Sequence, residues 1–173
     1  YYVSLLLLGN EVEAAGAASF AFKSVWDSMR AHGITTEDEF THLTIRKTVD
    51  CCKKKVARKN PKAFRIPSNR NFLIMGDAAN SKETGDAVTD VLNSLPELQR
   101  FIFVLHTAGG YSPDQIADTF KLDMKTVDIA LEAERANIER VVCRSGGNKR
   151  SYESVAEAIR RGEQEVKVPA AVD

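Results

Sequence analysis

The residues of this sequence that could do chemistry most directly are the cations of its first half. Between Thr41 and Arg70 there are ten basic residues and a single acid, Asp50, which give this stretch a formal charge of +9 in a chain whose net charge is zero. The basic residues are Arg46, Lys47, Lys53, Lys54, Lys55, Arg58, Lys59, Lys62, Arg65 and Arg70. Cations at this density attract phosphates and release counterions when they bind nucleic acid. The stretch therefore predicts a nucleic-acid contact, and the simpler alternative is a solvated helix end that the helix dipole stabilises.

Patterns of catalysis and of metal binding are missing from the sequence. There is no glycine-rich phosphate loop, no paired-acid motif and no catalytic triad. His32, His42 and His106 are widely spaced and lack a partner carboxylate or nucleophile. The cysteines form no C-x-x-C pair, and we expect Cys51 and Cys52 to be buried or idle thiols. The sequence thus predicts no enzyme, no metal site, no cofactor and no small-molecule substrate.

The elements that position these residues are helices, and the strongest pattern lies between Ser94 and Val142. The first helix of this segment is expected to open with a Ser94-x-x-Glu97 capping box, with Pro96 in its first turn, and to end at Gly109 and Gly110. Its apolar positions recur at helical spacing and are Leu95, Leu98, Phe101, Ile102 and Leu105. This periodicity predicts a helix with one buried face.

Two further helices are predicted directly after it. Ser112 and Gln115 form a capping box around Pro113, and Asp123 caps a longer helix. The apolar line of the longer helix is Val127, Leu131, Ile138 and Val141, and the residues on or near its other side are Lys125, Asp128, Ile129, Glu132 and Arg135. A short helix, a tight turn and a longer helix with a free face predict a helix-turn-helix, for which a generic three-helix bundle is the alternative.

The motif LPELQR, a helix, and then YSPDQIADTFKLDMKTVDIALEAER resembles region 4 of the sigma-70 family in its extracytoplasmic-function branch. The matching positions are Leu95, Pro96, Arg100, Gly110, Tyr111, Ile116, Ala117, Thr126 and Val127. The resemblance implies that Lys125, Thr126 and Arg135 contact DNA. The sequence departs from the family at Lys121, which stands where the turn glycine is usual. It also departs after Val127, where Asp128, Glu132 and Glu134 replace a basic run in which Arg135 alone is kept. Carboxylates repel phosphates, so a weakened DNA contact or a protein contact is expected.

The first part of the chain predicts three more helices. The first covers Tyr1 to Leu8 and is broken by Gly9 and Asn10. The second runs from Glu11 to Met29. A loop from Arg30 to Asp38 then leads to a third helix from Glu39 to about Lys59, which Thr36 or Thr35 can cap. Its inward-facing residues are Phe40, Leu43, Val49 and Cys52.

These helices resemble region 2 of the same family, in which a helix ending in F-x-x-(V/A)-W precedes a loop and a helix with a basic end. The matching positions are Phe22, Trp26, Phe40, Arg46 and Lys53, and the departures are Gly16, Ser19, Phe20, Leu43 and Asp50. The resemblance implies that Phe22 and Trp26 contact polymerase, whereas burial in the core is the alternative for both. It also implies that the basic helix contacts DNA through Arg46, Lys47, Lys53, Lys54, Lys55, Arg58 and Lys59.

We therefore expect an all-α chain of two small helical domains joined by a linker. The region 2-like domain is placed at 1–62, the linker at 63–91, the region 4-like helix-turn-helix domain at 92–144 and a C-terminal extension at 145–173. The extension is predicted to hold an amphipathic helix from Ser151 to Gly162, which packs Tyr152, Val155 and Ile159 on one of the domains, and the alternative is a frayed tail that does not pack. The sequence starts and stops as a fragment of something longer would. No membrane span or signal peptide is visible, and sparse cysteines favour a reducing cytoplasm.

The resemblance implies a sigma factor that binds core RNA polymerase and directs it to promoter DNA, with an anti-sigma factor as a further partner. The rival prediction is a sigma-like interaction protein whose helix-turn-helix binds a protein in place of DNA. A simple helix-turn-helix repressor is a third candidate, against which the region 2 resemblance argues.

Overall fold

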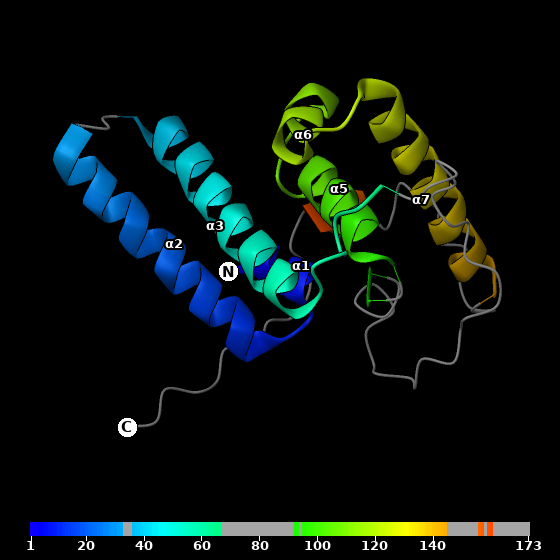
Figure 1. The fold of residues 1–173 in the computed structure, drawn as a ribbon, viewed down its shortest axis with the longest axis horizontal. Helices are drawn as coiled ribbons and strands as arrows, with labels where there is room; N and C mark the ends of the chain where they lie inside the picture. The colour runs from blue at the N-terminus through cyan, green and yellow to red at the C-terminus, as the bar shows by residue number, and fades with distance from the viewer. Residues whose placement is uncertain (33–35, 67–91, 94, 145–155, 158, 161–173) are drawn as a thin grey trace.

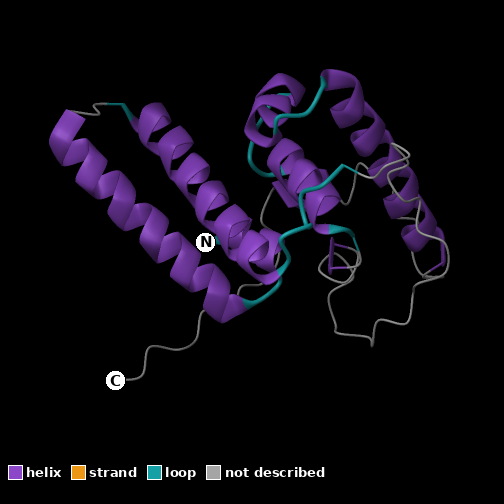
Figure 2. Cartoon of the chain, viewed as in Figure 1, coloured by secondary structure: helices purple, strands orange, loops and turns teal. Residues whose placement is uncertain are grey.

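The structure, a computed structural model, describes residues 1–32, 36–66, 92–93, 95–144, 156–157 and 159–160. Within these ranges all regular structure is helical, which confirms the predicted all-α class. The helices are α1 (Tyr2–Leu8), α2 (Glu11–His32), α3 (Glu37–Lys59), α5 (Glu97–Thr107), α6 (Pro113–Phe120) and α7 (Met124–Arg144). Figure 1 shows α2 and α3 as a long antiparallel hairpin and α5, α6 and α7 as a second group beside it. Figure 2 colours the helices and the loops that join them differently.

The helix α1 ends where the sequence predicts, at Gly9. This residue has a φ of 63° in the left-handed region, and its N–H donates to the Leu5 carbonyl. The positive φ strains any other residue here, and a Cβ would meet Oδ1 of Asn93, so the Asn93 side chain would have to move. The hydroxyl of Ser4 donates to the Ala14 carbonyl at 3.0 Å, which fastens α1 to α2. The end of α1 therefore lies directly against the chain that leads into the second group of helices.

The hairpin of α2 and α3 is longer than the sequence predicts. The predicted loop from Arg30 to Asp38 is wrong at both ends, because α2 continues to His32 and α3 begins at Glu37. Thr36 caps α3 as expected, since its Oγ1 accepts from the Glu39 N–H at 3.3 Å. Three acids, Glu37, Asp38 and Glu39, fill the first turn of α3, and Arg58 and Lys59 fill the last, so both ends suit the helix dipole.

The second group is a helix-turn-helix with a supporting helix. Ser112 and Gln115 form the predicted reciprocal capping box of α6, and Asp123 accepts from the Thr126 N–H at 2.7 Å at the start of α7. The predicted start of α5 at Ser94 is wrong, because α5 begins at Glu97 with Pro96 as its N-cap, and Pro96 makes no side-chain cap. The other partner of that box, Ser94, lies outside the described residues.

Arg100 of the LPELQR motif holds the entry to α5. Its guanidinium donates to Oδ1 of Asn93 and to the Leu95 carbonyl, at 3.4 Å each. Burial lowers the pKa of Arg100, and the nearby carboxylate of Glu97 opposes that shift. The arginine of the motif is thus a half-buried structural residue here.

The two groups of helices share one hydrophobic core. Its buried members run without interruption from Leu7 of α1 and Cys52 of α3 to Phe101 of α5 and Val127 of α7. The helix α5 is the centre, because it packs on α1 as well as on α6 and α7. The division into two domains at 1–62 and 92–144 stays a prediction, and the helices of both predicted domains bury their apolar faces against each other.

Part of the C-terminal extension belongs to this core. Ala156 and Ile159 are fully buried, and Ile159 is a member of the common hydrophobic cluster. Glu157 and Arg160 of the same short helical stretch are exposed. The predicted packing is confirmed at Ile159, whereas Tyr152 and Val155 lie outside the described residues.

Candidate nucleic-acid interface

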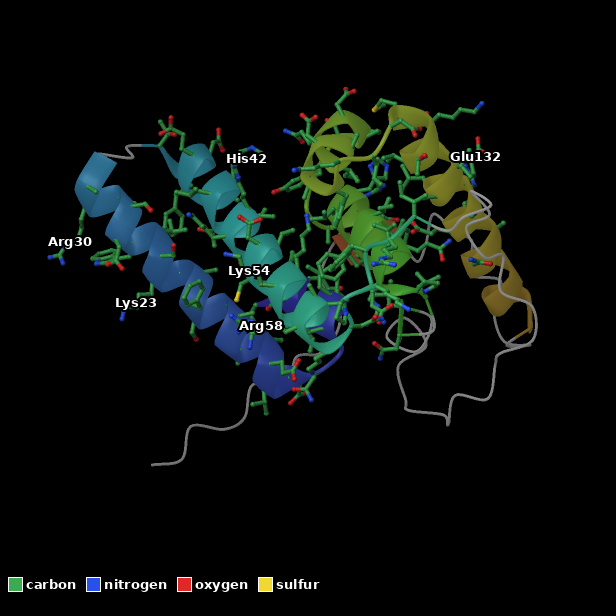
Figure 3. All side chains as sticks on the ribbon, viewed as in Figure 1. Lys23, Arg30, His42, Lys54, Arg58 and Glu132 are labelled. Carbon is green, nitrogen blue, oxygen red and sulfur yellow. The ribbon has the colours of Figure 1, made fainter. Side chains whose placement is uncertain are left out.

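The basic helix α3 has a face turned to solvent and a face turned to the helix-turn-helix. Among the predicted DNA contacts of α3, the exposed residues are Arg46, Lys54, Arg58 and Lys59, and the half-buried ones are Lys47, Lys53 and Lys55. Figure 3 shows Lys54 and Arg58 on successive turns of α3. The exposed cations follow each other at helical spacing, so one face of α3 can run along a phosphate backbone.

Two of the predicted cations already have partners within the chain. The ammonium of Lys59 pairs with the carboxylate of Glu13 of α2. Lys53 Nζ donates to the Thr119 carbonyl of α6 at 2.7 Å and lies 4.7 Å from the centre of the Phe120 ring. Burial is the main cause that lowers the pKa of Lys53, and Asp50 opposes it. The basic run is therefore divided between solvent and intramolecular contacts.

The recognition helix α7 has basic and acidic side chains on its exposed face. Lys125 and Arg135 are exposed, as are Asp128 and Glu132, the last of which is labelled in Figure 3. Thr126 is 2% exposed, so its hydroxyl does not reach the surface in this arrangement. Of the three predicted DNA contacts of α7, two lie at the surface, beside two carboxylates that repel phosphate.

The turn between α6 and α7 is closed by a lysine whose backbone has the left-handed conformation that glycine usually adopts. Lys121 has φ 55° and ψ 48°, and its N–H donates to the carbonyls of Ala117 and Asp118. A side chain in the left-handed region is strained relative to glycine. The helix-turn-helix geometry is thus kept at a position where the sequence departs from the family's usual glycine.

The candidate polymerase contacts Phe22 and Trp26 lie at the surface of α2. They are 54% and 53% exposed, so the alternative that places them in the core is wrong. The ring of Phe22 packs edge to face on that of Phe40, with 5.7 Å between centroids. Side chains spaced by four residues on an exposed helix face form an apolar ridge that a partner can cover.

Sequence reasoning missed the cations that flank this ridge. Lys23 and Arg30 are exposed on the same helix, and Figure 3 shows both directed away from α3. Their seven-residue separation places them on one side of α2, and this spacing was the signal that could have identified them. The surface of the hairpin thus combines exposed aromatic rings with cations of both helices.

The remaining candidates for chemistry are cysteine and histidine side chains. Burial raises the pKa of the Cys52 thiol to about 12, and the neighbouring Cys51 adds to the shift, so Cys52 stays protonated. His42 is exposed, and Nδ1 of His106 lies 3.3 Å from the Tyr111 carbonyl. In the part of the chain that the structure describes, no cluster of His, Cys, Asp and Glu could hold a metal ion. Within the same ranges, no helix has the length and apolar character that a membrane crossing requires.

The comparison with known families agrees with the geometry of the second group of helices. Residues 85–137 match the family described as Sigma-70, region 4. The match includes α5, α6 and the larger part of α7, and it is a match to a transcription-factor domain, not to an enzyme family. No curated protein and no solved structure matches the chain. Because the match begins at residue 85, the region 2 resemblance of the first part stays a prediction. The matched segment covers less than a third of the 173 residues, and it supports a sigma-70 relationship for the helix-turn-helix.

Proposed function

We propose that the chain is a sigma factor of the extracytoplasmic-function type that binds core RNA polymerase and directs it to promoter DNA. The observation that carries the proposal is the match of residues 85–137 to sigma-70 region 4, which falls on a capped helix-turn-helix with an exposed recognition helix. A recognition helix of this kind can lie in a major groove and contact base edges there. The proposed place of action is the cytoplasm.

The first part of the chain supports this function through its surface. The region 2-like domain is proposed to contact polymerase through Phe22 and Trp26 and DNA through the exposed cations of α3, such as Lys54 and Arg58. Cations fix a protein on phosphates without reading the sequence, whereas side chains of α7 would read base edges. The two parts would thereby divide affinity and specificity between them.

A binding assay with purified core polymerase tests the proposal. The full chain should be retained on immobilised core enzyme, and the holoenzyme should select a common duplex sequence from a random library. The double variant Phe22→Ala and Trp26→Ala should weaken retention at least tenfold if these rings are buried at the interface. Val12→Ala is the matched control, because Val12 is an apolar residue of α2 that is 82% exposed. Absence of retention of the unmodified chain would contradict the proposal.

The second candidate function is an interaction protein whose helix-turn-helix binds a protein such as an anti-sigma factor. The observation that favours it is the exposure of Asp128 and Glu132 on the recognition helix. Two carboxylates one turn apart suit a basic protein surface better than a phosphate backbone. Polymerase retention without any sequence selection from the library would support this second function over the first.

A further inference from the structure

One cation of the basic helix is placed differently from its neighbours. Lys53 reaches from α3 to the end of α6, where its Nζ donates to the Thr119 carbonyl at 2.7 Å. Its ammonium also lies over the Phe120 ring, 4.7 Å from the centroid. The residue next to it, Lys54, is exposed. Adjacent lysines of one run therefore have different environments.

The acceptor of this bond lies at a helix end that attracts cations. Thr119 belongs to the last turn of α6, where the carbonyls carry the negative end of the helix dipole and those of Ala117 and Asp118 accept from the Lys121 N–H. The turn that follows is closed by the strained Lys121 and by the bond from the Leu122 N–H to the Ala117 carbonyl at 2.9 Å. A charged donor at this end stabilises the last turn of α6 and the turn that joins α6 to α7.

The same side of α3 is held to the helix-turn-helix at other points. Nδ2 of Asn60 donates to Oε1 of Glu97 at 3.3 Å. Near the other end, Arg46 and Asp50 lie close enough to Tyr111 to influence its pKa, which burial raises. Lys53 lies between these contacts along the sequence, and its ammonium donates directly to α6, the first helix of the helix-turn-helix.

We propose that Lys53 is a clasp, meaning that its side chain holds the end of α6 to the basic helix α3. When a phosphate binds the ammonium of Lys53 in place of the Thr119 carbonyl, the end of α6 is released. The release half of the proposal rests on the proposed DNA-binding function, whereas the clasp itself does not. A backbone phosphate carries a full negative charge, which its two unbridged oxygens share, so it competes with a neutral carbonyl for an ammonium. Occupation of the basic run by nucleic acid would then loosen the connection between α6 and the recognition helix.

The clasp is tested in the full chain without DNA by residue-resolved amide hydrogen exchange. In Lys53→Met, which keeps much of the packing on Phe120, the amide of Leu122 should exchange about tenfold faster than in the unmodified chain. Lys54→Met removes the same charge from the adjacent exposed position and should leave this amide unchanged. The amide of Leu105, in the core of α5, reports general destabilisation, which would speed both amides alike. Equal exchange of Leu122 in the two variants, or equal acceleration of Leu105, would overturn the clasp.

The release is tested with random-sequence duplex DNA at low salt. DNA should speed the exchange of Leu122 in the unmodified chain and add no further acceleration in Lys53→Met. Slower exchange of Leu122 with DNA bound would overturn the release. If the chain binds no DNA, the release and the DNA part of the proposed function both fail, while a difference between the two variants in the DNA-free experiment still supports the clasp.

Discussion

The ring of Phe64 packs edge to face on the ring of Phe101, with 5.0 Å between the centroids and an interplanar angle of 83°. Phe120 completes the cluster at 5.6 Å from Phe64 and 6.0 Å from Phe101. Phe64 follows the basic helix, whereas Phe101 and Phe120 belong to the helix-turn-helix. Aromatic pairs at these distances contribute beyond the area that they bury. The cluster therefore couples the stability of the two groups of helices.

Replacing Phe64 tests this coupling. Phe64→Ala should lower the free energy of unfolding by roughly 3 kcal/mol, because a ring in contact with two others leaves a cavity. The unmodified chain should unfold in a single denaturant transition measured by circular dichroism, since its core is continuous. Ile66→Ala is the control, because Ile66 is 44% exposed. Two separate transitions in the unmodified chain would show that the shared core does not couple the groups.

Relief of strain at Lys121 should stabilise the turn of the helix-turn-helix. Lys121→Gly should raise the free energy of unfolding by about 1 kcal/mol, because glycine adopts the observed φ of 55° without the steric cost of a Cβ. Lys121→Ala removes the same charge and keeps the Cβ, so thermal unfolding of this variant should show no such gain. A gain of equal size in both variants would assign the effect to charge in place of backbone conformation.

Reversing the acids of the recognition helix should strengthen DNA binding. In the double variant Asp128→Lys and Glu132→Lys, repulsion of phosphates becomes attraction, and each new phosphate contact should steepen the salt dependence by about one unit on a logarithmic plot. Fluorescence anisotropy with duplex DNA at several salt concentrations measures both effects. Glu37→Lys with Asp38→Lys makes the same charge change at the far end of the hairpin and serves as the control. An equal gain in the control would mean that net charge alone sets the affinity.

The buried carboxyl of Glu134 should make stability fall as the pH rises. Burial raises the pKa of Glu134 well above its ordinary value of 4.5, and neither carboxylate oxygen has a hydrogen-bond partner among the residues that the structure describes. The folded chain therefore keeps the proton above pH 4.5 while the unfolded chain loses it. This contribution to stability is fully present below pH 4.5 and is lost as the pH rises through the folded-state pKa.

The variant Glu134→Gln is neutral at every pH and should remove that dependence. Denaturant unfolding between pH 4.5 and pH 8 should show a smaller decline for the variant than for the unmodified chain. Glu132→Gln is the matched control, because Glu132 lies two residues from Glu134 on the same helix and is exposed. Identical pH profiles of the unmodified chain and Glu134→Gln would exclude Glu134 as the source.

Removal of Ile159 from the core should destabilise the whole chain. Ile159→Ala should cost roughly 2–5 kcal/mol, the range for a fully buried isoleucine that leaves a cavity. Glu157→Ala alters an exposed position of the same stretch and should change stability little. Chemical denaturation of both variants gives the comparison. If a chain that ends at Arg144 has the stability of the full chain, the extension does not contribute to the core.

The sequence by itself determined the helices and most of their ends. Helical spacing of apolar residues and local caps depend on neighbours within one or two turns, so Gly9, Ser112 and Asp123 could be assigned from their order alone, whereas the cap of α3 was left between Thr35 and Thr36. The pattern of the helix-turn-helix was specific enough to predict region 4. The error at Ser94 and Glu97 arose because proline in the N-cap position moved the start of α5.

Only the tertiary structure decided which residues of one type face solvent and which contact another helix. The cations Lys53 and Lys54 are adjacent in one run, yet one reaches Thr119 and the other faces solvent. The sequence could not show this, because successive residues of a helix point about 100° apart and the partner lies far along the chain. Exposure of Phe22 and Trp26 and burial of Ile159 have the same cause. Hydrophobicity favours burial of all three, and the packing of helices distant in sequence decides which of them a neighbour covers.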